Sequence, residues 1–311
     1  MRERILAAMG AMRERILAAM GAVALIAAAL VARSLIVVDG PTSHEPGRSG
    51  DRPVVACTPD LAEVCSALVA DGAIRPAARP LELAGAAAPD DELDGWITWG
   101  AAPGVANFDA PGTWTVPSEV VASAPLGVLV AGGVVGCADG DDWASCVVEG
   151  ADGGLAVGIG SGTTAQGLAR LDPVARALVP ADGDFTTIPA AALRRIITSP
   201  QVAQSDFADQ ITTFLTRRGA LAMVVGPTPE LQEAATRGST SSVVVPVPRA
   251  TLTVVLATRA SAGAEPLPAS AVLSSRRASD ALTDLGMTPG TGPAPPESLA
   301  GELYAIYDKI R

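Results

Sequence analysis

The chain has 311 residues, of which 49% are hydrophobic and only 3% are aromatic, so Val, Ala, Leu and Ile must supply most of its core. This composition is typical of a folded protein and excludes a largely disordered one. The net charge of −11 disfavours nucleic acids and anionic lipid surfaces as partners.

The first 51 residues predict a membrane anchor followed by a spacer. Residues 1–11 recur unchanged as residues 12–22, which we interpret as a duplicated or alternative start. An uncharged run over residues 16–32 follows arginines and, with residues 35–38 added, reaches the length of a membrane-spanning helix. A cleaved signal peptide is the alternative. The predicted segments are a cytoplasmic N-terminus (1–15), a transmembrane signal anchor (16–38) and a linker (39–51).

This orientation predicts a single-pass protein of the cell membrane whose C-terminal domain lies outside the cytoplasm. Its four cysteines would then meet an oxidising compartment, where disulfides form. Their spacing favours Cys57–Cys65 and Cys137–Cys146, although four cysteines allow three pairings. Neither pair has Cys-x-x-Cys spacing and the only histidine, His44, lies in the linker, so we predict no metal and no cofactor.

Residues 54–65 read VVACTPDLAEVC and predict a strand followed at once by a helix. Thr58 stands at the expected N-cap, with Pro59 at the first helical position. Such a turn presents unpaired backbone N–H groups at the carboxyl end of a strand, where open α/β folds bind their ligands. Thr58 is therefore a candidate ligand-binding residue. The same Thr-Pro-acid-Leu pattern returns at residues 228–231.

Strand-like and helical runs alternate along the rest of the chain, which predicts a mostly parallel sheet. Further strands are expected at residues 80–83, 94–99, 113–116, 124–131, 154–158, 221–225, 242–247 and 251–257. Further helices are expected after the turn at 159–164, from Asp172, and over residues 189–198, 205–218, 276–285 and 299–310.

The Gly- and Thr-rich turn at residues 159–164 is the second candidate site. Hydroxyl and free N–H groups at the start of a helix can hold an oxyanion. Plain helix capping by the same hydroxyls is the alternative. The candidate ligand-binding residues in this turn are Ser161, Gly162, Thr163 and Thr164.

Two tryptophans share the strand expected at 94–99, and their odd spacing places them on opposite faces. Trp96 is expected in the core. Trp99 stands at the end of the strand beside Gly100 and is a candidate to stack on a ligand.

No catalytic residues are predicted. With one histidine, in the linker, the folded part can form no Ser-His-Asp or Cys-His arrangement. It also has no Gly-x-Ser-x-Gly elbow. Adjacent acids such as Asp90 and Asp91 are typical of solvated turns, so we expect a binding protein and not an enzyme.

In this order the elements resemble those of the type 2 periplasmic (solute) binding proteins. The resemblance rests on residues 54–61, 94–99, 123–129 and 158–164, with residues 242–248 as the return to the first lobe. It is closest to the membrane-tethered substrate-binding domains of actinobacteria, whose first strand and helix carry a similar Cys-x-Pro-Glu/Asp-Leu…Cys run. The chain departs from that pattern in its uncleaved-looking anchor and in lacking a lipoprotein cysteine.

The resemblance implies an α/β fold of two lobes that close like a hinge on a ligand. Residues 52–123 and 248–311 would form lobe one, and residues 124–247 lobe two. The expected function is extracytoplasmic binding of a small solute for uptake or sensing, with a membrane transporter or cell-envelope protein as partner. The alternative is a cell-surface interaction module with no transported ligand. Solute binding requires a polar cleft, whereas the interaction role predicts a collapsed or apolar one.

Overall fold

The structure is a computed structural model in which the chain divides into two compact units, residues 1–51 and 52–311. The predicted N-terminus, anchor and linker lie outside the described residues. None of the described helices is long and apolar enough to cross a membrane. The structure describes residues 52–115, 119–132, 143, 146–147, 150, 155–177, 206–217, 219–238, 241–260, 266–290 and 292.

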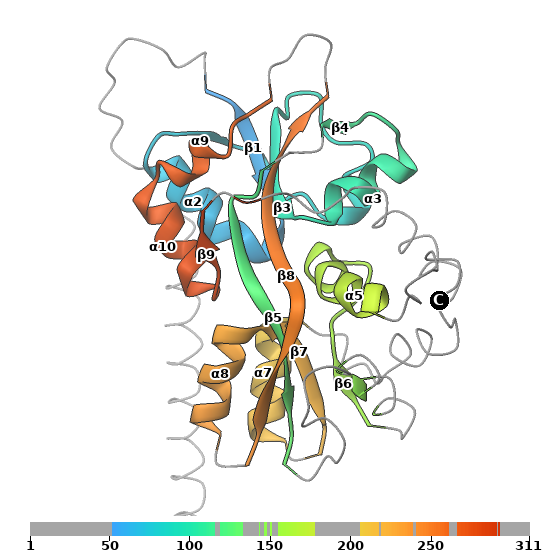
Figure 1. The fold of residues 1–311 in the computed structure, drawn as a ribbon. Coiled ribbons are helices and arrows are strands. Elements are labelled where there is room, and N and C mark those ends of the chain that lie inside the picture. The colour runs from blue at the N-terminus through green and yellow to red at the C-terminus, as the bar shows by residue number, and fades with distance from the viewer. Residues whose placement is uncertain are drawn as a thin grey trace, which may run out of the picture. The chain divides into compact units, whose positions relative to one another are not determined.

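A mixed sheet forms the centre of the second unit (Figure 1). Within the described ranges its strands are β1 (Val54–Cys57), β2 (Arg75–Pro76), β3 (Gly95–Trp99), β4 (Trp114–Thr115), β5 (Ala122–Val130), β6 (Val157–Gly158), β7 (Met223–Pro227), β8 (Val243–Arg259) and β9 (Thr288–Pro289). Their order is β2-β1-β3-β8-β5-β7-β6, with β4 paired to β8 and β9 paired to β5. We call the part with β1 to β4 the first lobe and the part with β6 and β7 the second lobe.

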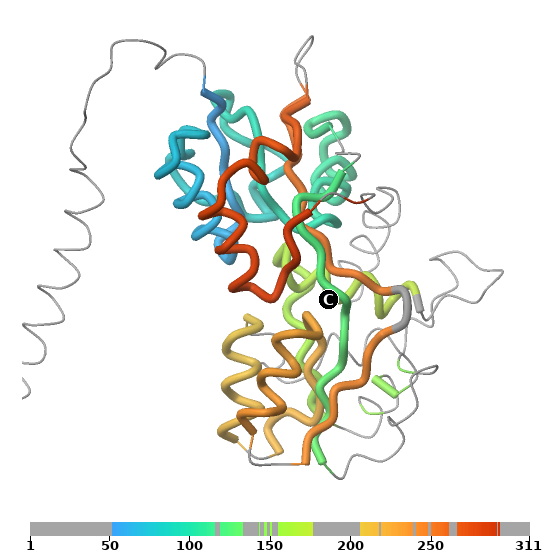
Figure 2. Tube along the Cα trace, turned by 60° about the vertical axis from the view of Figure 1, so that its left-hand side comes forward, coloured from blue at the N-terminus to red at the C-terminus, as the bar shows by residue number. Residues whose placement is uncertain are grey.

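Strands β5 and β8 run through both lobes and hold them together (Figure 2). They pair antiparallel from Ala122 opposite Val254 to Val130 opposite Val243, with a shift of register between Pro125 and Gly127. The sequence predicted two strands where β8 is a single one of 17 residues. Pro246 of β8 pairs with Gly127 beside the register shift, where a missing N–H donor costs little.

The prediction of a mostly parallel sheet was wrong. Strand β1 pairs parallel with β2 and β3, and β6 with β7, but every pairing made by β5 or β8 is antiparallel. Two strands that cross between lobes in opposite directions impose this mixture. The strand expected at residues 80–83 is also absent: the chain there enters a short 3-10 helix, and Arg75–Pro76 pairs with β1 instead.

Helices cover the sheet in both lobes (Figure 1). The described α-helices are α2 (Ala62–Ala70), α3 (Ala102–Asp109), α5 (Ala165–Ala177), α7 (Phe207–Thr216), α8 (Thr228–Arg237), α9 (Ser270–Leu273) and α10 (Arg276–Asp284). Two 3-10 helices, η1 (Pro59–Leu61) and η2 (Leu83–Gly85), accompany them. The helices expected at residues 189–198 and 299–310 lie outside the described part of the chain.

One predicted helix start was wrong. Pro173 lies inside α5 and does not open a new helix at Asp172. Leu168, Leu171 and Val174 are all buried, so apolar packing on both sides of the proline offsets its missing hydrogen bond. The helix therefore continues from the turn at 159–164, and its first turn faces the candidate site.

Candidate functional site

A cavity of about 750 Å³ lies between the lobes and the start of α5. Its residues come from the turn after β1, the start of η2, the end of β3, β8, the first turns of α5, the starts of α7 and α8, and the end of α10. The residues lining it are Thr58, Pro59, Asp60, Glu82, Leu83, Trp99, Thr163, Thr164, Ala165, Gln166, Arg170, Asp206, Phe207, Ala208, Pro227, Glu230, Leu252, Asp284 and Leu285. The cavity is therefore mixed in character, with charged side chains set among apolar ones.

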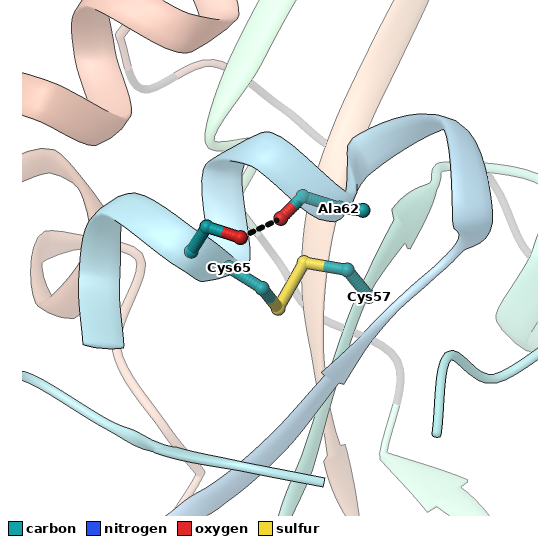
Figure 3. Close-up of a disulfide and its surroundings, with 4 residues drawn as sticks. Cys57, Ala62 and Cys65 are labelled. Carbon is teal, nitrogen blue, oxygen red and sulfur yellow. Dashed lines mark hydrogen bonds between the residues drawn. A yellow bond between two sulfur atoms is a disulfide. The ribbon is translucent and has the colours of Figure 1, made fainter. Parts of the chain in front are cut away.

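The turn after β1 is anchored by the Cys57–Cys65 disulfide (Figure 3). The two Cα atoms are 6.0 Å apart, within the usual range for a disulfide. This confirms the first predicted pair. Cys146 is disulfide-bonded, while its predicted partner, Cys137, lies outside the described residues. The disulfide fixes the end of β1 to the helix that follows, and so fixes the cavity wall between them.

Thr58 is almost fully buried at this wall, followed by Pro59 in the predicted position. Its side chain makes no capping hydrogen bond to η1, so capping does not explain the threonine here. Asp60, two residues later, also lines the cavity. Sequence reasoning passed over Asp60, because an acid in the first turn of a helix is a common capping feature.

Trp99 and Asp60 meet across the cavity wall, where the indole Nε1 donates a hydrogen bond to the Asp60 carboxylate. Trp99 is buried and lines the cavity. Burial raises the pKa of Asp60, and the hydrogen bond from Trp99 opposes that shift. Ligand stacking stays a prediction for Trp99, but the structure gives it a second role as the partner that orients Asp60.

Trp96, on the opposite face of β3, is fully buried against Trp114, with the ring centroids 5.4 Å apart. The predicted core position of Trp96 is confirmed.

The turn before α5 is held together by its own hydroxyl groups. Ser161 Oγ and Thr163 Oγ1 are 2.7 Å apart, and the Thr163 N–H donates to Ser161 Oγ. Thr164 Oγ1 donates to the Ser161 carbonyl and accepts from the Gly167 N–H, at 3.0 and 3.1 Å. Capping therefore uses the hydrogen of the Thr164 hydroxyl and one of its two acceptor lone pairs.

Of the four residues predicted in this turn, Thr163 and Thr164 line the cavity, and Ser161 and Gly162 do not. The free donors are instead on the backbone. The N–H groups of Ala165 and Gln166 have no acceptor among the described residues. Both residues line the cavity.

Arg170 is the main feature that sequence reasoning missed. Its side chain is almost fully buried, and Nη1 donates to Gln210 Oε1 at 2.8 Å and to the Val225 carbonyl at 3.2 Å. The guanidinium carbon lies 5.2 Å from the centroid of the Phe207 ring. Burial lowers the pKa of Arg170 to about 10, so it stays charged.

No carboxylate in the described part of the chain comes within ion-pair distance of Arg170, and its buried Nε has no hydrogen-bond acceptor there. A buried cation in this state is costly unless something pairs with it.

Carboxylates surround the rest of the cavity, and they come from both lobes: Asp60, Glu82, Asp206, Glu230 and Asp284. Asp206 also caps α7, accepting from the Asp209 N–H at 2.8 Å. Burial, with a smaller contribution from Glu233, raises the pKa of Glu230 to about 7. The charge of the cavity therefore depends on pH near neutrality.

Replacing Glu230 by glutamine should change how stability depends on pH. A carboxyl group whose pKa is higher in the folded state than in the unfolded chain destabilises the fold as pH rises through that interval, here from about 4.5 to about 7. Glu230→Gln cannot ionise, so its stability relative to the parent should rise by about 1–2 kcal/mol between pH 5 and pH 8, a figure reduced for partial solvent contact. Urea denaturation at both pH values measures this.

The exposed Glu92 provides the control, since Glu92→Gln should show no such change between the two pH values. An equal difference between Glu230→Gln and the parent at pH 5 and pH 8 would contradict the assignment.

Comparison with known proteins shows which solved structures have a similar fold. No family model and no curated protein matches the sequence, but 143 chains of known structure match the fold. The fold is similar to that of an ABC transporter from Clostridium perfringens (11% identity, 83% of this chain, 99% of that chain, TM-score 0.50). It is also similar to a ferric binding protein from Campylobacter jejuni (10% identity, 83% of this chain, 99% of that chain, TM-score 0.51). Thiaminase I from Bacillus thiaminolyticus matches at 12% identity, over 83% of this chain and 90% of that chain, with a TM-score of 0.45.

The described unit thus has the two-lobed, type 2 periplasmic-binding-protein-like fold that the sequence resemblance implied. At these identities the likeness concerns the fold alone.

Proposed function

We propose that this chain binds a small solute in the cavity between its lobes and serves an uptake or sensing system. One observation carries the proposal: the lobes enclose about 750 Å³ with charged side chains from both sides. This is the size and the mixed lining typical of small-molecule sites. An interaction module was expected to have a collapsed or apolar cleft, so the charged lining favours the solute.

The predicted site residues divide into two groups in this proposal. Thr58, Trp99, Thr163 and Thr164 contact the solute from the cavity wall. Ser161 and Gly162 keep the turn before α5 in shape. Asp60 and Arg170 join the first group.

We further propose that the binding unit works outside the cytoplasm, held by the predicted anchor at residues 16–38, beside a membrane transporter or cell-envelope partner. The Cys57–Cys65 disulfide supports an oxidising compartment.

A thermal-shift screen of the full chain, purified in detergent, tests the proposal with amino acids, oxyanions, sugars and polyamines. A solute present at 100 times its dissociation constant should stabilise the protein by about 2.7 kcal/mol, and hence raise Tm by several degrees. Closure of the lobes on the solute should reduce the radius of gyration measured by small-angle X-ray scattering. Absence of stabilisation by every class, together with an unchanged radius, would reject solute binding.

A further inference from the structure

The cavity offers hydrogen-bond donors at one end, around the first turn of α5. The Arg170 side chain runs back toward the start of its own helix, as helical side chains do. Its guanidinium lies so close to Gly160 that a Cβ there would overlap Nη2. Gly160 has φ of +89°, a conformation open to glycine. The guanidinium therefore lies beside the turn that leads to the free N–H groups of Ala165 and Gln166.

The described residues leave several of these donors without an acceptor. Arg170 Nε is buried without a partner, and the two N–H groups have none among the described residues. A helix N-terminus stabilises negative charge, and an arginine beside it adds a full positive charge. One anionic group bound here would balance the charge of Arg170 and accept hydrogen bonds from the two N–H groups.

The carboxylates around the rest of the cavity favour a positively charged group. Asp60, Asp206 and Glu230 lie close enough to Arg170 for their charges to act on it. Trp99 donates to Asp60, but none of the three carboxylates forms an ion pair with a cation of the described chain. A solute bearing only negative charge would enter a cavity where acidic side chains outnumber Arg170 five to one.

A metal ion does not fit this wall well, because no group of three acidic, histidine or cysteine side chains in the described ranges is arranged to hold one. Separated carboxylates suit an organic cation, whose positive charge spreads over several N–H or C–H groups. The aromatic ring of Trp99, which lines the cavity and donates to Asp60, suits such a group too.

From these contacts we infer that the solute is a zwitterion, with its anionic group at Arg170 and the start of α5 and its cationic group among Asp60, Asp206 and Glu230. This rests on the proposed function and names the class of solute for the same cavity. Neither a simple cation nor a simple anion satisfies both ends. A simple cation meets the positive Arg170, and a simple anion meets the carboxylates.

Pairs of compounds that differ by one charged group test the inference by calorimetric titration of the full chain. Arginine and agmatine differ by a carboxylate, as do ornithine and putrescine, and 4-aminobutyrate and butyrate differ by an amine. At least one compound that carries charges of both signs should bind 10-fold or more tighter than its counterpart, which carries charge of one sign only. Equal or tighter binding of agmatine, putrescine or butyrate would overturn the inference and leave solute binding intact. Tight binding of a sugar, with no binding of any zwitterion, would have the same consequence. Binding of no compound in these pairs or in the wider screen would overturn solute binding itself.

Two variants test the site for the anionic group and the site for the cationic group separately. Arg170→Met keeps an unbranched apolar side chain and removes the guanidinium with its donors, so it should weaken the best zwitterion about 10-fold or more and leave its decarboxylated counterpart unaffected. Asp60→Asn keeps an acceptor for Trp99 and removes the charge. It should weaken the zwitterion by a similar factor, with no loss for the counterpart that lacks the amine.

Glu63→Gln, an exposed change on α2 away from the cavity, serves as the control. If Arg170→Met unfolds the protein, Asp60→Asn still decides the cationic end. Equal weakening of all compounds by Asp60→Asn would overturn the inference.

Discussion

Replacing Gly167 by alanine is expected to lower the free energy of unfolding by about 1–3 kcal/mol, the range expected for overpacking, and to weaken solute binding by about 10-fold or more. Gly167 lies in the first turn of α5. A Cβ there would overlap the carbonyl oxygen, carbonyl carbon and nitrogen of Ser161. These are backbone atoms and cannot rotate away, so the turn before α5 must move. That turn carries Thr163 and Thr164 at the cavity wall.

The sign of this effect is informative, because alanine normally stabilises a helix over glycine by about 1 kcal/mol. A loss of stability can only come from the close approach of the turn. Urea denaturation of the full chain measures stability, and calorimetric titration with the compound giving the largest thermal shift measures binding.

Gly85→Ala is the matched control. Its nearest neighbour would be Leu81 Cδ1 at 3.6 Å, an ordinary contact, so it should change stability by less than about 0.5 kcal/mol. If Gly167→Ala proves as neutral as Gly85→Ala in both measurements, the turn is not held by this contact.

Local signals in the sequence were sufficient to predict both turns at the cavity. The Thr-Pro-Asp sequence after β1 and the Gly-Ser-Gly-Thr-Thr sequence before α5 stop a strand and start a helix by rules that involve only a few neighbouring residues. The structure has both turns, and Thr58, Trp99, Thr163 and Thr164 line one cavity. The Cys57–Cys65 disulfide was predictable for the same reason, since its cysteines are eight residues apart.

What the sequence did not reveal depends on residues distant along the chain. In the sequence Arg170 is one of several polar residues in a helical segment, and nothing local distinguishes it. Its role depends on hydrogen bonds to Gln210 and to the Val225 carbonyl, which are 40 and 55 residues away. The length of β8 also depends on distant residues, because pairing with β5 keeps β8 extended on both sides of its prolines. Local rules also predicted that a new helix starts at Asp172, whereas burial in the core keeps one helix continuous through Pro173.

The largest loss of stability is expected for Trp114→Ala, at about 3–5 kcal/mol by the usual cost of truncating a buried tryptophan. Trp114 is buried against Trp96, and its Nε1 donates to the Ala86 carbonyl at 2.8 Å. Truncation removes the ring contact and leaves that buried carbonyl without its donor. It also leaves a cavity between β4, β3 and the segment around η2. The midpoint of urea denaturation reports the loss.

Two further variants separate the contributions. Trp114→Phe keeps an aromatic ring and loses the hydrogen bond, so it should fall between the parent and Trp114→Ala. Phe108→Ala removes an aromatic side chain that is 53% exposed and should cost less than about 0.5 kcal/mol. Because Trp96 and Trp99 point to opposite faces of β3, Trp114→Phe should leave the Trp99–Asp60 contact and solute affinity unchanged. A large loss of affinity in Trp114→Phe would mean that packing of the first-lobe core, and not the cavity wall alone, sets the position of Asp60.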